Sequence, residues 1–116
     1  MLAAAASACV ARGALAQEAA LAGRCSPELG ELLFADPEKA RDVAVERGKA
    51  EPGNGWCAAA AGEAYLLLGN WFFGVRELVR AEELLAGAEG VTAEERSKVK
   101  VLLCAALERT DRKSVV

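Results

Sequence analysis

The cysteines are the side chains of this chain with the widest chemistry, because a thiol can bind a metal, act as a nucleophile or form a disulfide. Four are present, far apart and without any C-x2-C element: Cys9, Cys25, Cys57 and Cys104. This spacing does not match a structural zinc site. The chain also has no histidine, which is the commonest metal ligand and general base. We therefore expect no metal and no cofactor.

The expected state of the cysteines depends on the compartment. We expect a cytoplasmic protein, in which Cys25 and Cys57 are free thiols packed as small apolar side chains. The alternative is export, because the A-x-A sequence ending at Ala16 has the form of a signal-peptidase site. Cleavage near Ala16 would place the chain in an oxidising compartment, where Cys25 and Cys57 could pair. Arg12, which interrupts the apolar run before that site, favours the cytoplasm.

The acidic and glycine-rich stretches show no pattern of an active site. Glu82 and Glu83 are adjacent in sequence and therefore point in different directions on a helix, as do Glu94 and Glu95. The glycine-rich stretch over 52–55 lacks the spacing of either common phosphate-binding loop. We predict that the protein is not an enzyme.

Charge and hydropathy narrow the classes of partner. The net charge is -3, with 14 basic and 17 acidic residues interspersed, so no basic face for nucleic acid is expected. No apolar run approaches the roughly 18 residues of a membrane-spanning helix, because charged residues interrupt the N-terminal segment. The expected partner is another protein or a peptide, without nucleic acid or membrane.

The elements that must carry any binding surface are predicted to be helices. Hydrophobic residues make up 53% of the chain and aromatic residues only 5%, and alanine is the commonest of the hydrophobic residues. Alanine has the highest helix propensity, and its small side chain lets helices approach closely. No segment alternates with a period of two over the length of a strand. We predict a single all-α domain over 1–116.

Start and stop signals divide the chain into helical hairpins. Ser26 and Asp36 each precede a proline, the order expected for an N-cap and a first helical residue. Thr92 followed by Glu95 indicates a capping box. These signals predict five to six antiparallel helices joined by short turns. The expected segments are an Ala-rich first helix over 1–24, a hairpin over 26–54, a second hairpin over 55–88, a capping helix over 92–110 and a tail over 111–116.

A Gly-Asn-aromatic turn at 69–71 lies near the middle of the second hairpin. Counted from this turn, residues suited to a close helix crossing recur at fixed spacings: Gly62, Tyr65, Gly74, Leu78 and Ala81. This register resembles a tetratricopeptide repeat, a 34-residue helix-turn-helix unit. Residues 26–54 resemble a degenerate copy. The resemblance implies hairpins stacked as a short right-handed superhelix. The neighbouring aromatic run over 71–73 is expected in the hairpin core, with a partner-binding patch as the alternative.

The resemblance also implies a binding face, because the first helix of each repeat lines the concave side of the stack. The residues expected to be exposed there and to bind a partner are Trp56, Ala59, Glu63, Leu66, Leu67 and Asn70. Trp56 is the expected anchor, although it could equally cover the turn at Pro52 or contact the preceding helix. One peptide-binding variant of the family holds a carboxylate with lysines and asparagines, whereas the matching helix of this chain has Ala59, Ala60 and Glu63. A partner helix or an extended apolar peptide is therefore expected instead of an acidic chaperone tail.

The resulting hypothesis is a non-catalytic protein-protein interaction module that binds a peptide or a partner helix on this concave face. The first alternative is a self-associating helical domain, such as a homodimer that buries the Ala-rich first helix. A further alternative is a fragment of a helical-repeat bacterial transcriptional regulator, because residues 91–107 faintly resemble the opening of a helix-turn-helix domain.

Overall fold

The computed structural model describes residues 21–115, and these residues are helical apart from short connections. No strand occurs among them, which confirms the predicted all-α architecture over the described range. After helical residues 21–25 come α3 (Pro27–Ala35), α4 (Pro37–Ala50), α5 (Gly55–Leu67), α6 (Trp71–Ala86) and α7 (Ala93–Val115).

Two expected boundaries differ from the structure. Most of the predicted first helix over 1–24 lies outside the described residues, and its described end continues one residue further, to Cys25. The last helix also exceeds its predicted range of 92–110, because α7 continues to Val115. Residues 108–115 contain neither proline nor glycine, so no residue in that stretch favours an end to the helix.

Side-chain caps explain most of the helix starts. The side-chain oxygens of Asp36, Asn54 and Asn70 each accept a backbone N–H bond from the first turn of the following helix. Ser26 is the exception to the prediction, since its side chain makes no capping bond and is buried. α3 still begins at Pro27, whose fixed φ suits the first helical position.

The predicted capping box is present at the start of α7. The backbone N–H of Glu95 donates to Thr92 Oγ1 over 3.1 Å, and the backbone N–H of Thr92 donates to Glu95 Oε1 over 3.0 Å. The α5–α6 turn is fixed by Gly69, which has a φ of +79°. Its N–H donates to the carbonyl of Leu66, and the next N–H donates to the carbonyl of Tyr65. This is the pair of bonds of a Schellman motif.

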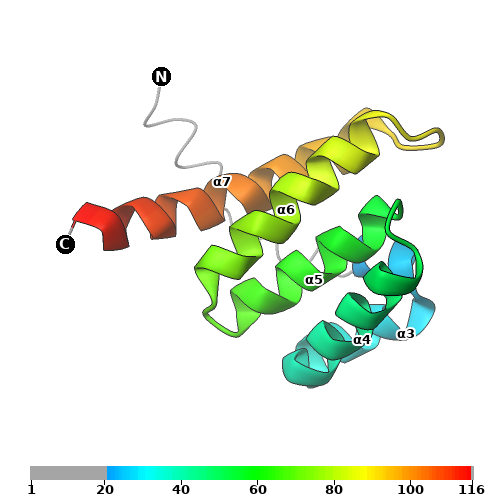
Figure 1. The fold of residues 1–116 in the computed structure, drawn as a ribbon, viewed down its shortest axis with the longest axis horizontal. Helices are drawn as coiled ribbons and strands as arrows, with labels where there is room; N and C mark the ends of the chain where they lie inside the picture. The colour runs from blue at the N-terminus through cyan, green and yellow to red at the C-terminus, as the bar shows by residue number, and fades with distance from the viewer. Residues whose placement is uncertain (1–20, 116) are drawn as a thin grey trace.

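α5 is the central helix of the described fold. It lies between α4 and α6, while α3 packs against α4 and α7 packs against α6 (Figure 1). Two buried clusters meet at α5. We call the first the α6–α7 cluster, which comprises Leu21, Ala58, Ala59, Leu66, Leu78, Ala81, Leu85, Val99, Leu102 and Ala106. We call the second the α3–α4 cluster, which comprises Ala22, Leu29, Leu33, Ala40, Ala44, Ala60, Ala61 and Ala64.

The crossing of α5 and α6 depends on two glycines that face leucines of the opposite helix. A Cβ added to Gly62 would lie 2.7 Å from Cγ of Leu78, and one added to Gly74 would lie 2.5 Å from Cδ2 of Leu66. Leu78 and Ala81 are fully buried in the same contact. The predicted packing role of these small residues is therefore confirmed.

Candidate functional site

The six residues predicted to bind a partner do not form an exposed face. Ala59, Glu63 and Leu66 are only 1%, 1% and 7% exposed. Trp56, Leu67 and Asn70 are half-buried. The expected exposure is therefore wrong for three of the six positions.

Packing from distant parts of the chain explains this difference. Ala59 and Leu66 belong to the α6–α7 cluster, together with Leu21 and with Val99 and Leu102 of α7. The resemblance predicted an open concave side here, whereas this side of α5 shares a continuous core with residues distant in sequence. Leu66 also fills the space beside Gly74, where a Cβ would clash with it.

The predicted anchor Trp56 is held by two other helical segments. The guanidinium of Arg24 lies over its ring, 4.4 Å from the ring centroid. Arg24 also forms an ion pair with Glu95 near the start of α7. The Trp56 ring packs against the α6–α7 cluster as well. These contacts give Trp56 a structural role in joining residues 21–25, α5 and α7.

The remaining two predicted positions are also engaged within the fold. Asn70 caps α6, because its side-chain oxygen accepts the backbone N–H of Phe73 over 3.4 Å. Leu67 packs against the α3–α4 cluster. Neither side chain lies fully free at the surface.

An open groove lies elsewhere, between α4 and α6 and across α5. This α4–α6 groove has a volume of about 330 Å³ and is lined by residues of α4, α5, α6 and the α4–α5 turn. Figure 1 shows the three helices side by side in the order α4, α5, α6. Its position between α4 and α6 was not predicted from the sequence. It brings together residues 44–49, 52–58, 65 and 73–80, which no single motif connects.

Small and aromatic side chains form the apolar part of the groove. Gly48 of α4 leaves open space, because a Cβ added there would meet no atom within 4 Å. Tyr65 of α5 stacks on Phe73 of α6 with ring centroids 5.6 Å apart. Phe73 remains 39% exposed. The groove thus presents an aromatic wall next to an unfilled position.

Three cationic side chains and one carboxylate also line the groove. Arg80 donates to the carbonyl of Pro52 over 3.0 Å, and its Nη1 lies 3.9 Å from Glu77 Oε1. Lys49 lies 3.5 Å from Glu46, a pair that is mostly exposed. Arg76 contacts an aromatic ring instead, since its guanidinium lies 5.4 Å from the Phe73 ring centroid.

Arg41, also on α4, does not add a free cation. Its guanidinium pairs with Asp42 over 3.0 Å, and the side-chain hydrogen bond to Asp42 raises the pKa of Arg41. Arg41 is therefore permanently charged and already partnered by a carboxylate.

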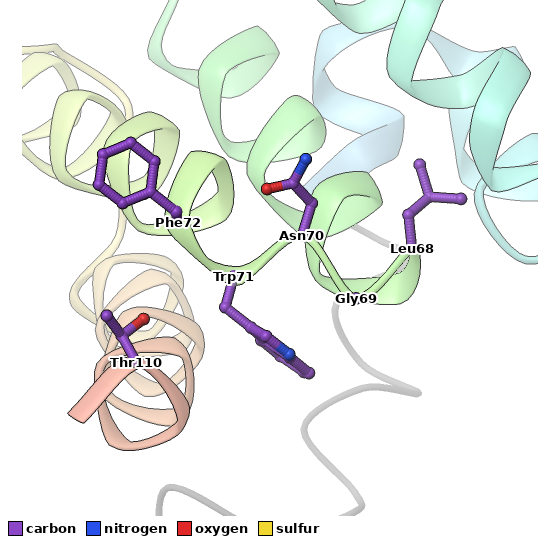
Figure 2. A pocket seen from close by; sticks show the side chains of 6 residues that line it. All are labelled: Leu68, Gly69, Asn70, Trp71, Phe72 and Thr110. Carbon is purple, nitrogen blue, oxygen red and sulfur yellow. The ribbon is translucent and has the colours of Figure 1, made fainter. Parts of the chain in front are cut away.

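A second hollow, of about 390 Å³, lies at the α5–α6 turn and reaches Thr110 of α7. Figure 2 shows Trp71 and Phe72 pointing in opposite directions from the start of α6. Phe72 is 66% exposed, whereas Trp71 packs against the α6–α7 cluster beneath the guanidinium of Arg109. The aromatic run over 71–73 is therefore split between core and surface.

The three cysteines among the described residues are oxidised, whereas free thiols were expected for Cys25 and Cys57. Cys25 and Cys57 form a disulfide with a Cα–Cα distance of 4.7 Å, and Cys104 is also disulfide-bonded. The Cys25–Cys57 pairing is the one expected for the exported alternative. The prediction of free thiols rested on the choice of a cytoplasmic compartment. The disulfide contradicts the predicted free thiols.

Residues 21–115 contain no group of three or more potential ligands arranged to hold a metal ion. None of their helices is long and apolar enough to cross a membrane.

Comparisons of the chain with protein-family models, with curated proteins and with solved structures found no match. The candidate site therefore has to be judged by its own geometry.

Proposed function

We propose that the protein is a non-catalytic interaction module that binds a peptide segment of another protein in the α4–α6 groove. The observation that carries this proposal is the groove itself, which is open, about 330 Å³ in volume, and lined by both apolar and charged side chains. Binding grooves combine an apolar surface with a few polar groups that fix the orientation of the ligand. The α4–α6 groove has both.

We also propose a tetratricopeptide-like arrangement of the hairpins. The close α5–α6 crossing at Gly62 and Gly74 supports it, because both residues fall on the small positions of the repeat register. The order α4, α5, α6 is consistent with one hairpin stacked on the second helix of the preceding one. The proposed binding surface differs from the face expected of such repeats, since Ala59, Glu63 and Leu66 are buried.

Selection from a displayed library of random dodecapeptides on the immobilised, oxidised protein tests this function. We expect clones with a shared sequence pattern, and synthetic copies of them should bind the protein in solution by fluorescence polarisation. A library that yields no clone above the bare support would overturn the proposal.

Light scattering on the same preparation addresses self-association. A monomer, or a dimer that still binds the selected peptides, agrees with the proposal. A tight dimer that binds none of them would favour the oligomerisation domain instead.

A further inference from the structure

We propose that the occupant of the α4–α6 groove is an extended acidic segment of a partner protein, with one apolar side chain inserted next to Gly48. This inference rests on the proposed function and specifies the chemistry of the partner. Three observations support it: the charge of the groove lining, the availability of Arg76, and the size of the hollow.

The charge of the lining is opposite to that of the chain. Lys49, Arg76 and Arg80 face a single carboxylate, that of Glu77, whereas the chain as a whole has a net charge of -3. A positive patch on an acidic protein attracts acidic segments and repels basic ones. The charge of the groove therefore favours acidic partner segments over basic ones.

Arg76 is the cation best placed to bind an incoming carboxylate. Arg80 is already bonded to the carbonyl of Pro52, and Lys49 lies near Glu46. Arg76 is exposed, and within residues 21–110 no carboxylate lies in ion-pair distance of it. Its contact with the Phe73 ring orients the guanidinium. A guanidinium held in this way can donate two parallel hydrogen bonds to one carboxylate.

The size of the hollow favours an extended segment over a helix. Ligand pockets span about 300–1,000 Å³, and the α4–α6 groove, at about 330 Å³, lies at the lower end of that range. A helix laid in a groove needs room for several side chains spaced by a turn. Gly48, with open space around an added Cβ, and the stacked Tyr65–Phe73 pair all line the groove, so we place one aliphatic or aromatic side chain of the partner among them. The flanking residues of an extended peptide then reach the cationic rim.

Two labelled nonapeptides test the charge preference directly. The acidic probe has a central leucine with two aspartates on each side, and the neutral probe has asparagines in place of the four aspartates. We expect the acidic probe to bind about tenfold more tightly at low salt, equivalent to about 1.4 kcal/mol. The preference should decrease as added salt screens the exposed charges.

Arg76→Glu tests the charge of the groove, with Arg96→Glu as its matched control. Arg96 is exposed near the start of α7 and makes no contact with the groove. Arg76→Glu should abolish the preference for the acidic probe, and Arg96→Glu should leave it. Equal losses in both variants would mean that the overall charge of the protein, and not the groove, attracts the probe.

Gly48→Leu tests the hollow, with Gly87→Leu as its control. A Cβ at either glycine meets no atom within 4 Å, so both substitutions add a side chain to open space. Replacing Gly48 inside α4 also improves helix propensity. Gly48→Leu should weaken both probes at least tenfold while the thermal midpoint stays the same or rises, and Gly87→Leu should not weaken either probe.

The outcomes separate this inference from the proposed function. Selected library clones that bind regardless of Gly48→Leu and Arg76→Glu would overturn the inference and leave the interaction function standing. Equal affinity of the two probes, or binding of neither, also overturns the inference. Failure of the library and of both probes would overturn both.

Discussion

The two sides of α5 are packed by different means. Leucines dominate the larger side chains of the α6–α7 cluster, and they interlock with Gly62 and Gly74 at the helix crossing. Six of the eight residues of the α3–α4 cluster are alanines, and a disulfide from Cys57 to Cys25 lies close by. A buried alanine removes much less apolar surface from water than a buried leucine. We call the side of α5 that faces the α6–α7 cluster the leucine side, and the side that faces the α3–α4 cluster the alanine side. We infer that apolar burial stabilises the leucine side. The alanine side is stabilised by the close approach of its helices together with the Cys25–Cys57 disulfide.

This difference also bears on where the protein can bind a partner. The leucine side continues into α7 and covers the positions first predicted to bind, such as Ala59 and Leu66. Between α4 and α6, the small residues Ala44 and Gly48 line the groove, and Gly48 leaves open space. Small residues therefore serve two purposes: they allow helices to pack closely, and at the surface they leave the groove open.

The largest expected effect comes from breaking the leucine side. Leu78→Ala removes a fully buried side chain and should lower the free energy of unfolding by about 2–5 kcal/mol. Chemical denaturation followed by circular dichroism measures this change. A loss below about 1 kcal/mol would mean that the site is not a well-packed core position.

The Gly62–Leu78 contact can be isolated by a double-mutant cycle. Gly62→Ala alone should cost about 1–3 kcal/mol, because its Cβ would lie 2.7 Å from Leu78 Cγ. In the Leu78→Ala background the same change should cost much less, since only the Gly74 carbonyl oxygen, 3.3 Å from the added Cβ, remains as a close contact and alanine favours the helix. Additive effects in the cycle would contradict the proposed contact.

The next largest effect should come from removing the Cys25–Cys57 disulfide on the alanine side. Replacing both Cys25 and Cys57 with alanine opens a disulfide between residues 32 apart and should cost about 3 kcal/mol. Alanine avoids placing an unpaired hydroxyl at the buried Cys57 position. Differential scanning calorimetry measures the loss. An unchanged thermal midpoint would show that the disulfide does not stabilise the alanine side, contrary to this expectation.

Several helix starts could be predicted because their causes are local. Asp36, Asn54 and the Thr92–Glu95 pair act within one turn of their own position. The glycine crossing could be predicted from the repeat register, which fixes which residues of the hairpin meet. Ser26 shows the limit of local signals, since a buried serine at an N-cap position makes no capping bond.

The exposure of three predicted binding residues, Ala59, Glu63 and Leu66, was mispredicted because exposure depends on contacts between distant segments. Nothing near Ala59 or Leu66 in sequence indicates that Leu21 and Val99 share their cluster. The α4–α6 groove likewise joins Gly48 to Phe73 through the packing of three helices. Free thiols were expected at Cys25 and Cys57 because a cytoplasmic compartment was chosen, and the residues alone did not decide the compartment.

The smallest effect should come from a single methyl on the alanine side. Ala40→Gly removes one buried methyl group and lowers helix propensity, and should cost about 1–2 kcal/mol. The same denaturation experiment measures the loss in free energy of unfolding for Ala40→Gly and for Leu78→Ala. The ratio of the two losses compares the two sides of α5. A cost equal to that of Leu78→Ala would contradict the assigned difference between them.

Chemical-shift mapping tests the central claim most directly, that a partner peptide occupies the α4–α6 groove. Isotope-labelled protein would be titrated with a peptide from the library selection. We predict that the largest amide shift changes occur at Val45, Gly48, Tyr65 and Arg76, which line the groove. Changes centred instead on Trp56 or on Phe72 would contradict the account.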